Sequence, residues 1–160
     1  TGRKLVKELG YQILLTGTAS EKALTDEIAV GIGEQAYSLA GTFSLEEFVL
    51  LNKLAPLVIS VNTGTIHIAA ATGTPVIVLY ALTNPQHSPW KVPGKVFPFD
   101  VPTRLRSKNE VIRYVHDNLF LPNVKMASPE EIVAAAKELL ENGSIQGIPE
   151  LIALRESFPS

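Results

Sequence analysis

The stretch that decides the fold runs from residue 57 to residue 80 and reads LVISVNTGTIHIAAATGTPVIVLY. It begins and ends with nearly continuous apolar runs, at 57–61 and 76–80, that are rich in β-branched side chains. Such runs are typical of strands covered on both faces in a parallel sheet. Between them, the Ala-rich segment from Gly64 to Thr72 predicts a short helix that ends at Gly73 and lies close to the sheet. The stretch is therefore predicted to be a compact βαβ unit.

The rest of the chain alternates between helix and strand signals in the same way. Ser44 and Ser128 each begin a Ser-x-x-Glu capping box, which marks the start of a helix. Helices are predicted at 3–9, about 20–30, 44–54 and 128–143, and strands at 11–15 and 37–40. This alternation, without an internal repeat or a long linker, predicts a single α/β domain over residues 1–160 with a Rossmann-like, doubly wound parallel sheet.

Composition and charge exclude several classes of protein. The 160 residues are 46% hydrophobic and 19% charged with a net charge of −2, which fits neither a disordered segment nor a nucleic-acid binder. Cysteine is absent, which excludes a disulfide framework and a thiolate zinc site. The apolar runs are far shorter than a membrane-spanning helix, and the first ten residues do not form a signal peptide. We expect a cytoplasmic protein and, since the chain begins without Met inside a predicted helix, an excised piece of a longer one.

Three loops are candidates for a ligand site, because ligands of open parallel sheets bind beyond the carboxyl ends of the strands. They are residues 16–21, 62–65 and 83–87. The second loop leads from a strand directly into a helix, so free amides and the positive end of the helix would stabilise a phosphate there. Gly64 would permit close approach of the backbone to this phosphate.

Side chains around the second loop would suit a sugar nucleotide. Thr63 and Thr65 offer hydroxyl groups, and His67 lies one turn into the helix, near any bound anion. Asn62 both donates and accepts hydrogen bonds, which suits sugar hydroxyls. The alternative is that Asn62 or Thr63 only caps the helix, that Gly64 only makes the turn, and that His67 is half-buried.

The first loop, which contains Gly17, and the segment before Ser44 offer two more candidates. Glu21 would accept hydrogen bonds from two ribose hydroxyls, but residues 18–21 also fit a capping box, in which the carboxylate bonds a backbone amide instead. Phe43 is either a core aromatic or a face on which a base stacks. The three histidines match no compact metal-ligand spacing, so no metal site is expected. Motifs of serine hydrolases, phosphate-loop NTPases and NAD-dependent enzymes are absent from the sequence.

The 57–80 stretch resembles the signature of glycosyltransferase family 9, the heptosyltransferases of lipopolysaccharide core assembly. In that family a strand that ends in Asp-Thr-Gly is followed by a His three residues after the Gly, by small residues and by Gly-Thr-Pro-Val; here Asn62 replaces the Asp. Residues 81–85 take the place of the family's Gly-Pro-Thr-x-Pro loop. The similarity extends over 14–21, 41–46 and 126–133.

The resemblance implies a GT-B architecture, in which two Rossmann-like domains face a cleft and residues 1–160 are the C-terminal half without its first strand. It implies that Glu21 binds the donor ribose, that Phe43 lies against the base, and that the amides of 63–65 surround the donor diphosphate. Asn62 takes the position of the Asp that contacts the donor sugar, so the hydrogen bonds are kept and the charge is lost. The expected donor site consists of Gly17, Glu21, Phe43, Asn62, Thr63, Gly64, Thr65, His67 and Thr83.

The resemblance therefore implies the donor-binding half of an inverting, metal-independent glycosyltransferase that uses a nucleotide-diphosphate sugar such as ADP-heptose and no cofactor. The general base and the phosphate-binding Lys of the family belong to parts outside this chain, so no catalytic residue is expected within 1–160. The expected acceptor is the lipopolysaccharide core or another glycan, with at most peripheral contact at the inner face of the cytoplasmic membrane and no nucleic acid. Two alternatives are a non-catalytic sugar-nucleotide or polysaccharide-binding module and a GT-B-related epimerase of nucleotide sugars.

Overall fold

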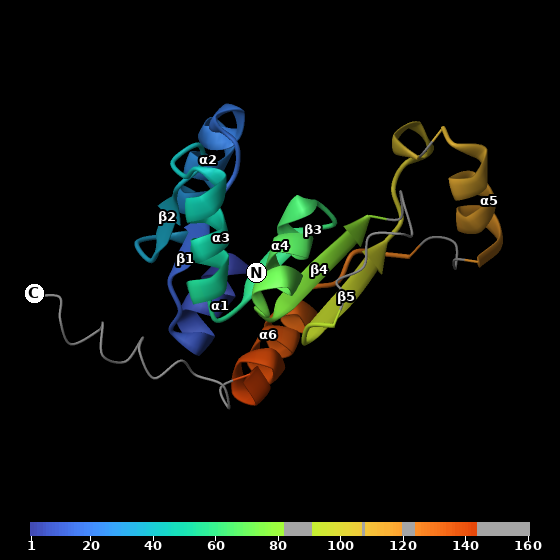
Figure 1. Ribbon diagram of the computed structural model, residues 1–160. Helices are drawn as coiled ribbons and strands as arrows, with labels where there is room; N and C mark the ends of the chain where they lie inside the picture. The colour runs from blue at the N-terminus through green and yellow to red at the C-terminus, as the bar shows by residue number, and fades with distance from the viewer. Residues whose placement is uncertain (82–90, 107, 120–123, 144–160) are drawn as a thin grey trace, which may run out of the picture.

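The computed structural model describes residues 1–81, 91–106, 108–119 and 124–143 (Figure 1). Helices and strands alternate as predicted up to residue 81, and the described residues beyond it form one more strand followed by helices. The helices are α1 (Gly2–Leu9), α2 (Lys22–Ile32), α3 (Leu45–Leu54), α4 (Gly64–Thr72), α5 (Glu110–Leu119) and α6 (Pro129–Gly143), with short 3-10 helices η1 (Ala19–Glu21) and η2 (Thr103–Leu105). The strands are β1 (Ile13–Leu15), β2 (Ala36–Ser38), β3 (Val58–Val61), β4 (Val76–Ala81) and β5 (Gly94–Phe99). Within the described part of the chain, no helix combines the length and the hydrophobicity that a membrane span requires.

The strands pair in parallel, which confirms the predicted α/β class. Their hydrogen bonds join them into one sheet of order β1-β2 and another of order β3-β4-β5. In a parallel pair, every second residue of a strand hydrogen-bonds the neighbouring strand through its backbone N–H and C=O, and the residues in between point these groups to the opposite side. Since the N–H groups of Ile13 and Val58 bond toward β2 and β4, the backbone groups of Leu14 and Ile59 face the other edges of β1 and β3. Both sheets nevertheless border one apolar cluster, because Ile13 and Ile59 pack against the same buried residues of α1, α6 and β4.

Strand β4 is covered on both faces, as the apolar run at 76–80 predicted. From β4, Ile77 and Leu79 pack with α1 and α6, whereas Val76 and Val78 pack on the other side with α4. This alternation explains why the strand is apolar at every position. Of the three alanines predicted to bring the α4 helix close to the sheet, only Ala69 is fully buried, because a single side of a helix faces its neighbour.

The predicted helix ends are confirmed in detail. Ser44 begins α3 with a capping box, in which the Ser44 N–H donates to Glu47 Oε2 at 2.8 Å and the Glu47 N–H donates to Ser44 Oγ at 3.3 Å. Ser128 begins α6 in the same way. Gly10 and Gly73 end α1 and α4 with left-handed φ angles of 72° and 76°.

Two elements were not predicted, β5 and α5. Strand β5 contains Pro98 and lies at the edge of its sheet, where a proline is tolerated but where the apolar pattern is weak. In helix α5 the apolar residues Val111 and Tyr114 are 71% and 67% exposed, so these two side chains do not mark a face buried in the core.

Candidate functional site

The first predicted loop lies next to the segment that follows β2. Both continue from the carboxyl ends of paired strands, and the Gly41 N–H donates a 2.8 Å hydrogen bond to the Gly17 C=O. Gly41 has a φ of 73°, and a Cβ built there would lie 2.8 Å from the Ala19 Cα. This close approach requires glycine at position 41. The structure thus places Gly17 and Glu21 beside the segment that carries Phe43.

Glu21 is engaged locally, as the capping alternative predicted. Its Oε2 accepts hydrogen bonds from the N–H and from the Oγ1 of Thr18, both at 2.7 Å. The backbone hydrogen bond first, and the hydroxyl second, hold the pKa of the Glu21 carboxyl below its usual value. Gly17 leaves room for this carboxylate, since a Cβ built there would lie 3.0 Å from Oε2. Glu21 is exposed, and no hydrogen bond within the described residues reaches its second oxygen, Oε1, which remains open to a ligand.

Phe43 is half-buried directly before the Ser44 cap. It belongs to neither of the two apolar clusters built from the described residues. The aromatic ring is therefore not a member of the described core, and stacking on a base stays a prediction.

The second loop leaves the start of α4 without a side-chain cap. Thr63 is the N-cap residue, with an extended backbone (φ −117°), but its hydroxyl makes no cap hydrogen bond. No hydrogen bond among the described residues reaches the N–H groups of Gly64 and Thr65, whereas the Ile66 N–H bonds the Thr63 C=O at 3.2 Å. Among the described residues, a Cβ built on Gly64 would meet nothing within 4 Å. The first two amides of this helix, at the carboxyl end of the sheet, therefore have no hydrogen-bond partner in the described part of the chain.

Asn62 is bound to the end of β4 and does not cap the helix. The Ala81 N–H donates to Asn62 Oδ1 at 3.1 Å, and Asn62 Nδ2 donates to the Ala81 C=O at 3.4 Å. The hypothesis that Asn62 caps α4 is therefore wrong. Contact between Asn62 and sugar hydroxyls stays a prediction, because Oδ1 can accept one further hydrogen bond and Nδ2 can donate one more.

The remaining predicted residues are placed as follows. His67 is exposed on α4, which contradicts the alternative interpretation that it is half-buried, and its predicted place near a bound anion stays a prediction; Thr65 is half-buried. Thr83 lies outside the described residues. Within the described ranges, no hydrogen bond or ion pair joins the Gly17, Glu21 and Phe43 group to the second loop. No three His, Asp or Glu residues gather there in a way that would hold a metal ion.

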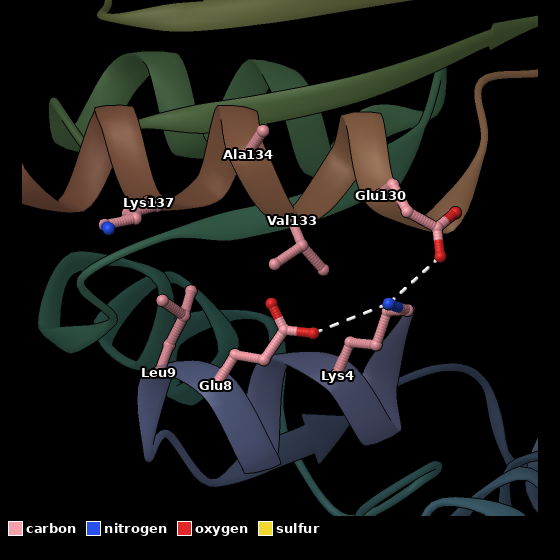
Figure 2. Close-up of a pocket in the computed structure, with 7 residues that line it drawn as sticks. All are labelled: Lys4, Glu8, Leu9, Glu130, Val133, Ala134 and Lys137. Atoms are coloured by element: carbon pink, nitrogen blue, oxygen red, sulfur yellow. Dashed lines mark hydrogen bonds and ion pairs between the residues drawn. The ribbon is translucent and has the colours of Figure 1, made fainter.

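A hollow of about 330 Å³ lies away from these loops, between α1 and α6. Figure 2 shows the Lys4 amine between the carboxylates of Glu8 and Glu130, at 3.5 and 3.0 Å. None of the predicted site residues lines this hollow. Such exposed ion pairs contribute little to stability. The sequence gives no signal for this pocket, because the two helices that form it are far apart along the chain.

Helix α4 thus begins at the carboxyl end of a parallel sheet, which is the place where open α/β sheets generally bind their ligands. The model of glycosyltransferase family 9 (heptosyltransferase) matches residues 3–103, which is more than half of the chain. The chain therefore belongs to this family. The matched range contains all of the predicted site residues.

Curated relatives match over about half of this chain. The lipooligosaccharide heptosyltransferase 2 of Haemophilus influenzae is 36% identical over 84 residues, which are 50% of this chain and 24% of the relative. The lipopolysaccharide heptosyltransferase 3 of Escherichia coli K12 is 38% identical over 89 residues, 54% of this chain and 25% of the relative. The matched part thus spans about a quarter of the length of each relative.

Solved structures share the fold over most of the chain. A glycosyl transferase of family 9 from Veillonella parvula superposes with a TM-score of 0.65 at 19% identity, over 84% of this chain and 38% of the other. The ADP-heptose lps heptosyltransferase II of E. coli gives a TM-score of 0.64 at 22% identity, over 88% of this chain and 40% of the other. The Rossmann-like, GT-B-type fold is therefore confirmed.

Proposed function

We propose that residues 1–160 bind the nucleotide-diphosphate sugar donor of an inverting, metal-independent glycosyltransferase. The uncapped start of α4 is the observation that carries the proposal. Its Gly64 and Thr65 amides have no hydrogen-bond partner among the described residues, and no atom of these residues lies within 4 Å of a Cβ built on Gly64. A diphosphate would accept hydrogen bonds from these amides and would interact favourably with the positive end of the helix.

The same arrangement supplies a chemical role during transfer. When an acceptor hydroxyl attacks the anomeric carbon of the donor, negative charge accumulates on the departing nucleoside diphosphate. Fixed amides at the start of α4 stabilise this charge without reorganising, which lowers the barrier. Thr63 and Thr65 add hydroxyl groups at the same place, where the backbone before Gly64 is exposed.

The first loop would hold the nucleoside. The open oxygen of Glu21, Oε1, would accept a ribose hydroxyl while Oε2 stays on Thr18. The half-buried Phe43 would support the base from the neighbouring segment. In this arrangement Gly17 acts indirectly, because it leaves the space that the Glu21 carboxylate occupies.

Relatives support the kind of donor and acceptor. One solved structure with the same fold is an ADP-heptose lps heptosyltransferase, and the curated relatives are lipopolysaccharide and lipooligosaccharide heptosyltransferases. We infer that the donor is ADP-heptose or a close analogue. The acceptor would be a lipopolysaccharide core or related glycan, reached at the inner face of the cytoplasmic membrane.

A non-catalytic sugar-nucleotide module is the second candidate. It is favoured by Asn62, which replaces the Asp expected from the family resemblance and has both polar groups on Ala81. Turnover of ADP-heptose by the complete protein separates the two candidates. Binding of the donor without transfer or hydrolysis would support the module.

Calorimetric titration with ADP tests the binding site directly. Gly64→Val places a branched side chain where the diphosphate would lie, so we expect affinity for ADP to fall at least 100-fold with little change in melting temperature. Gly31→Val is the matched control, since Gly31 also lies in a helix with nothing within 4 Å of a built Cβ and is remote from the site. Equal affinity in Gly64→Val and the control would show that the diphosphate binds elsewhere.

A further inference from the structure

We propose that Asn62 is a positioning residue, whose side-chain amide ties the turn before α4 to the end of β4 and so aims the first amides of α4 outward. The inference rests on the proposed diphosphate site at that helix. It differs from a direct contact between Asn62 and the transferred sugar of the donor, because a positioning role affects the binding of ADP, which lacks that sugar.

The strand register shows why a tie is needed at this point. The β3–β4 ladder ends where Val61 lies opposite Leu79. Beyond that pair β4 continues to Ala81, whereas the main chain of β3 turns away and enters α4 at Gly64. The two backbones therefore separate at the place where the site begins.

The Asn62 side chain hydrogen-bonds β4 at the point where the β3 backbone no longer does. Its Oδ1 accepts from the Ala81 N–H at 3.1 Å, and its Nδ2 donates to the Ala81 C=O at 3.4 Å. In a parallel ladder a residue bonds two residues of the neighbouring strand, whereas the Asn62 amide, with its one acceptor and its donor group, bonds both backbone groups of one residue, Ala81, just beyond the last ladder pair. The bond to the Ala81 N–H also settles which end of the amide is the oxygen, because only an oxygen accepts there.

No other side chain of similar size provides both bonds. An ionised carboxylate would accept from the Ala81 N–H but would place a second acceptor against the Ala81 C=O. It would also add negative charge beside a bound diphosphate. With Asn62 in place, two side-chain hydrogen bonds join the turn to β4 beyond the last ladder pair, and no described residue hydrogen-bonds the Gly64 and Thr65 amides.

Amide exchange followed by NMR tests the tie without any ligand. In Asn62→Ala we expect the Ala81 amide to exchange at least tenfold faster and the Gly64 and Thr65 amide resonances to shift, with exchange in α6 unchanged. In Asn62→Asp the Ala81 amide stays protected, because the carboxylate still accepts. Unchanged exchange at Ala81 in Asn62→Ala would overturn the proposal, whether or not the protein binds ADP.

Affinity for ADP separates positioning from sugar contact. We expect Asn62→Ala to bind ADP about tenfold more weakly than the unmodified chain. Asn118→Ala is the control, because Asn118 also donates its amide to a backbone carbonyl, that of Tyr114, but lies on α5. Unchanged affinity for ADP in Asn62→Ala, with loss only for the sugar nucleotide, would assign Asn62 to direct sugar recognition and overturn the proposal. If the unmodified chain itself does not bind ADP, the proposed function fails, and the exchange measurement still decides whether the tie orients the turn.

Discussion

The loops at residues 16–21 and 62–65 both contain Thr-Gly-Thr, but they differ in whether their polar groups are hydrogen-bonded within the loop. In the first, the Thr18 N–H and hydroxyl are bonded by Glu21, and Gly41 is pressed against Ala19. In the second, helix α4 begins within the sequence Thr63-Gly64-Thr65, no described residue hydrogen-bonds its first two amides, and the Asn62 side chain beside it is bound to Ala81. A helix start becomes an anion site when the residues around it are held by something other than its own amides.

Glycine provides the largest expected contrast between the two regions. Gly41→Ala forces a side chain into the left-handed region and against the Ala19 backbone, so we expect a loss of about 2–4 kcal/mol in the free energy of unfolding. Gly64→Ala meets open space and should change this free energy by less than about 1 kcal/mol. Urea unfolding of both variants measures the difference. Equal stabilities would show that the contact between residues 41 and 19 does not hold in solution.

The two carboxylate caps offer a smaller and more selective comparison. The Glu21 carboxylate on Thr18 and the Glu131 carboxylate on Ser128 have the same geometry, with both bonds at 2.7 Å in the first and 2.8 Å in the second. Glu21→Gln should weaken ADP binding about tenfold, since a charge-assisted hydrogen bond becomes a neutral one.

Glu131→Gln is the control for that change, and we expect it to leave ADP affinity unchanged. Both variants should melt close to the unmodified chain, because Gln also serves in a capping box. A loss of stability in Glu21→Gln with unchanged ADP affinity would assign Glu21 to capping alone.

The caps also predict a dependence of stability on pH. Hydrogen bonds from Thr18 and Ser128, from the backbone first, hold the pKa values of Glu21 and Glu131 below their ordinary value of 4.5. The unfolded chain therefore binds protons at a higher pH than the folded chain does, and stability falls as the pH decreases through the lowered pKa values. The urea midpoint should be level between about pH 5 and 7 and fall below about pH 4.5. The double variant Glu21→Gln, Glu131→Gln should show a shallower fall; an identical profile would refute this origin.

Strand edges give the smallest expected effect. The N–H of Ile13 donates to the Gln35 C=O at 2.8 Å and that of Val58 donates to the Pro75 C=O at 2.9 Å, whereas the N–H groups of Leu14 and Ile59 face the other edges of β1 and β3, where no described strand pairs with them. We expect amide exchange at Leu14 and Ile59 to be faster by about tenfold or more than at their neighbours. Uniform protection along β1 and β3 would show that another chain segment covers these edges.

Much of the fold was predictable because it rests on neighbouring residues. The apolar runs around Ile59 and Val78 specified strands, and the capping boxes at Ser44 and Ser128 located helix starts within one residue. Strand β5 was not predicted because Pro98 interrupts the apolar pattern of a strand. This proline is tolerated because β5 lies at the edge of its sheet.

The candidate site was predictable in its location but not in the roles of its side chains. Gly64 was identified because a strand, a glycine and a helix follow one another in sequence. Whether Glu21 caps a helix or faces a ligand depends on which of its two oxygens is engaged, and the sequence is compatible with both. The exposure of His67 likewise depends on which side of α4 meets the sheet.

The sequence by itself determined the α/β alternation, the two capping boxes and the helix that begins at Gly64, because these features depend on contacts within about one helical turn. Tertiary structure alone decided that Asn62 is bound to Ala81, 19 residues away, and that Gly41 must approach Ala19. Such contacts join residues whose distance in space is set by strand register and by the path of the intervening helix. No local preference of Asn or Gly specifies the partner that register brings to it.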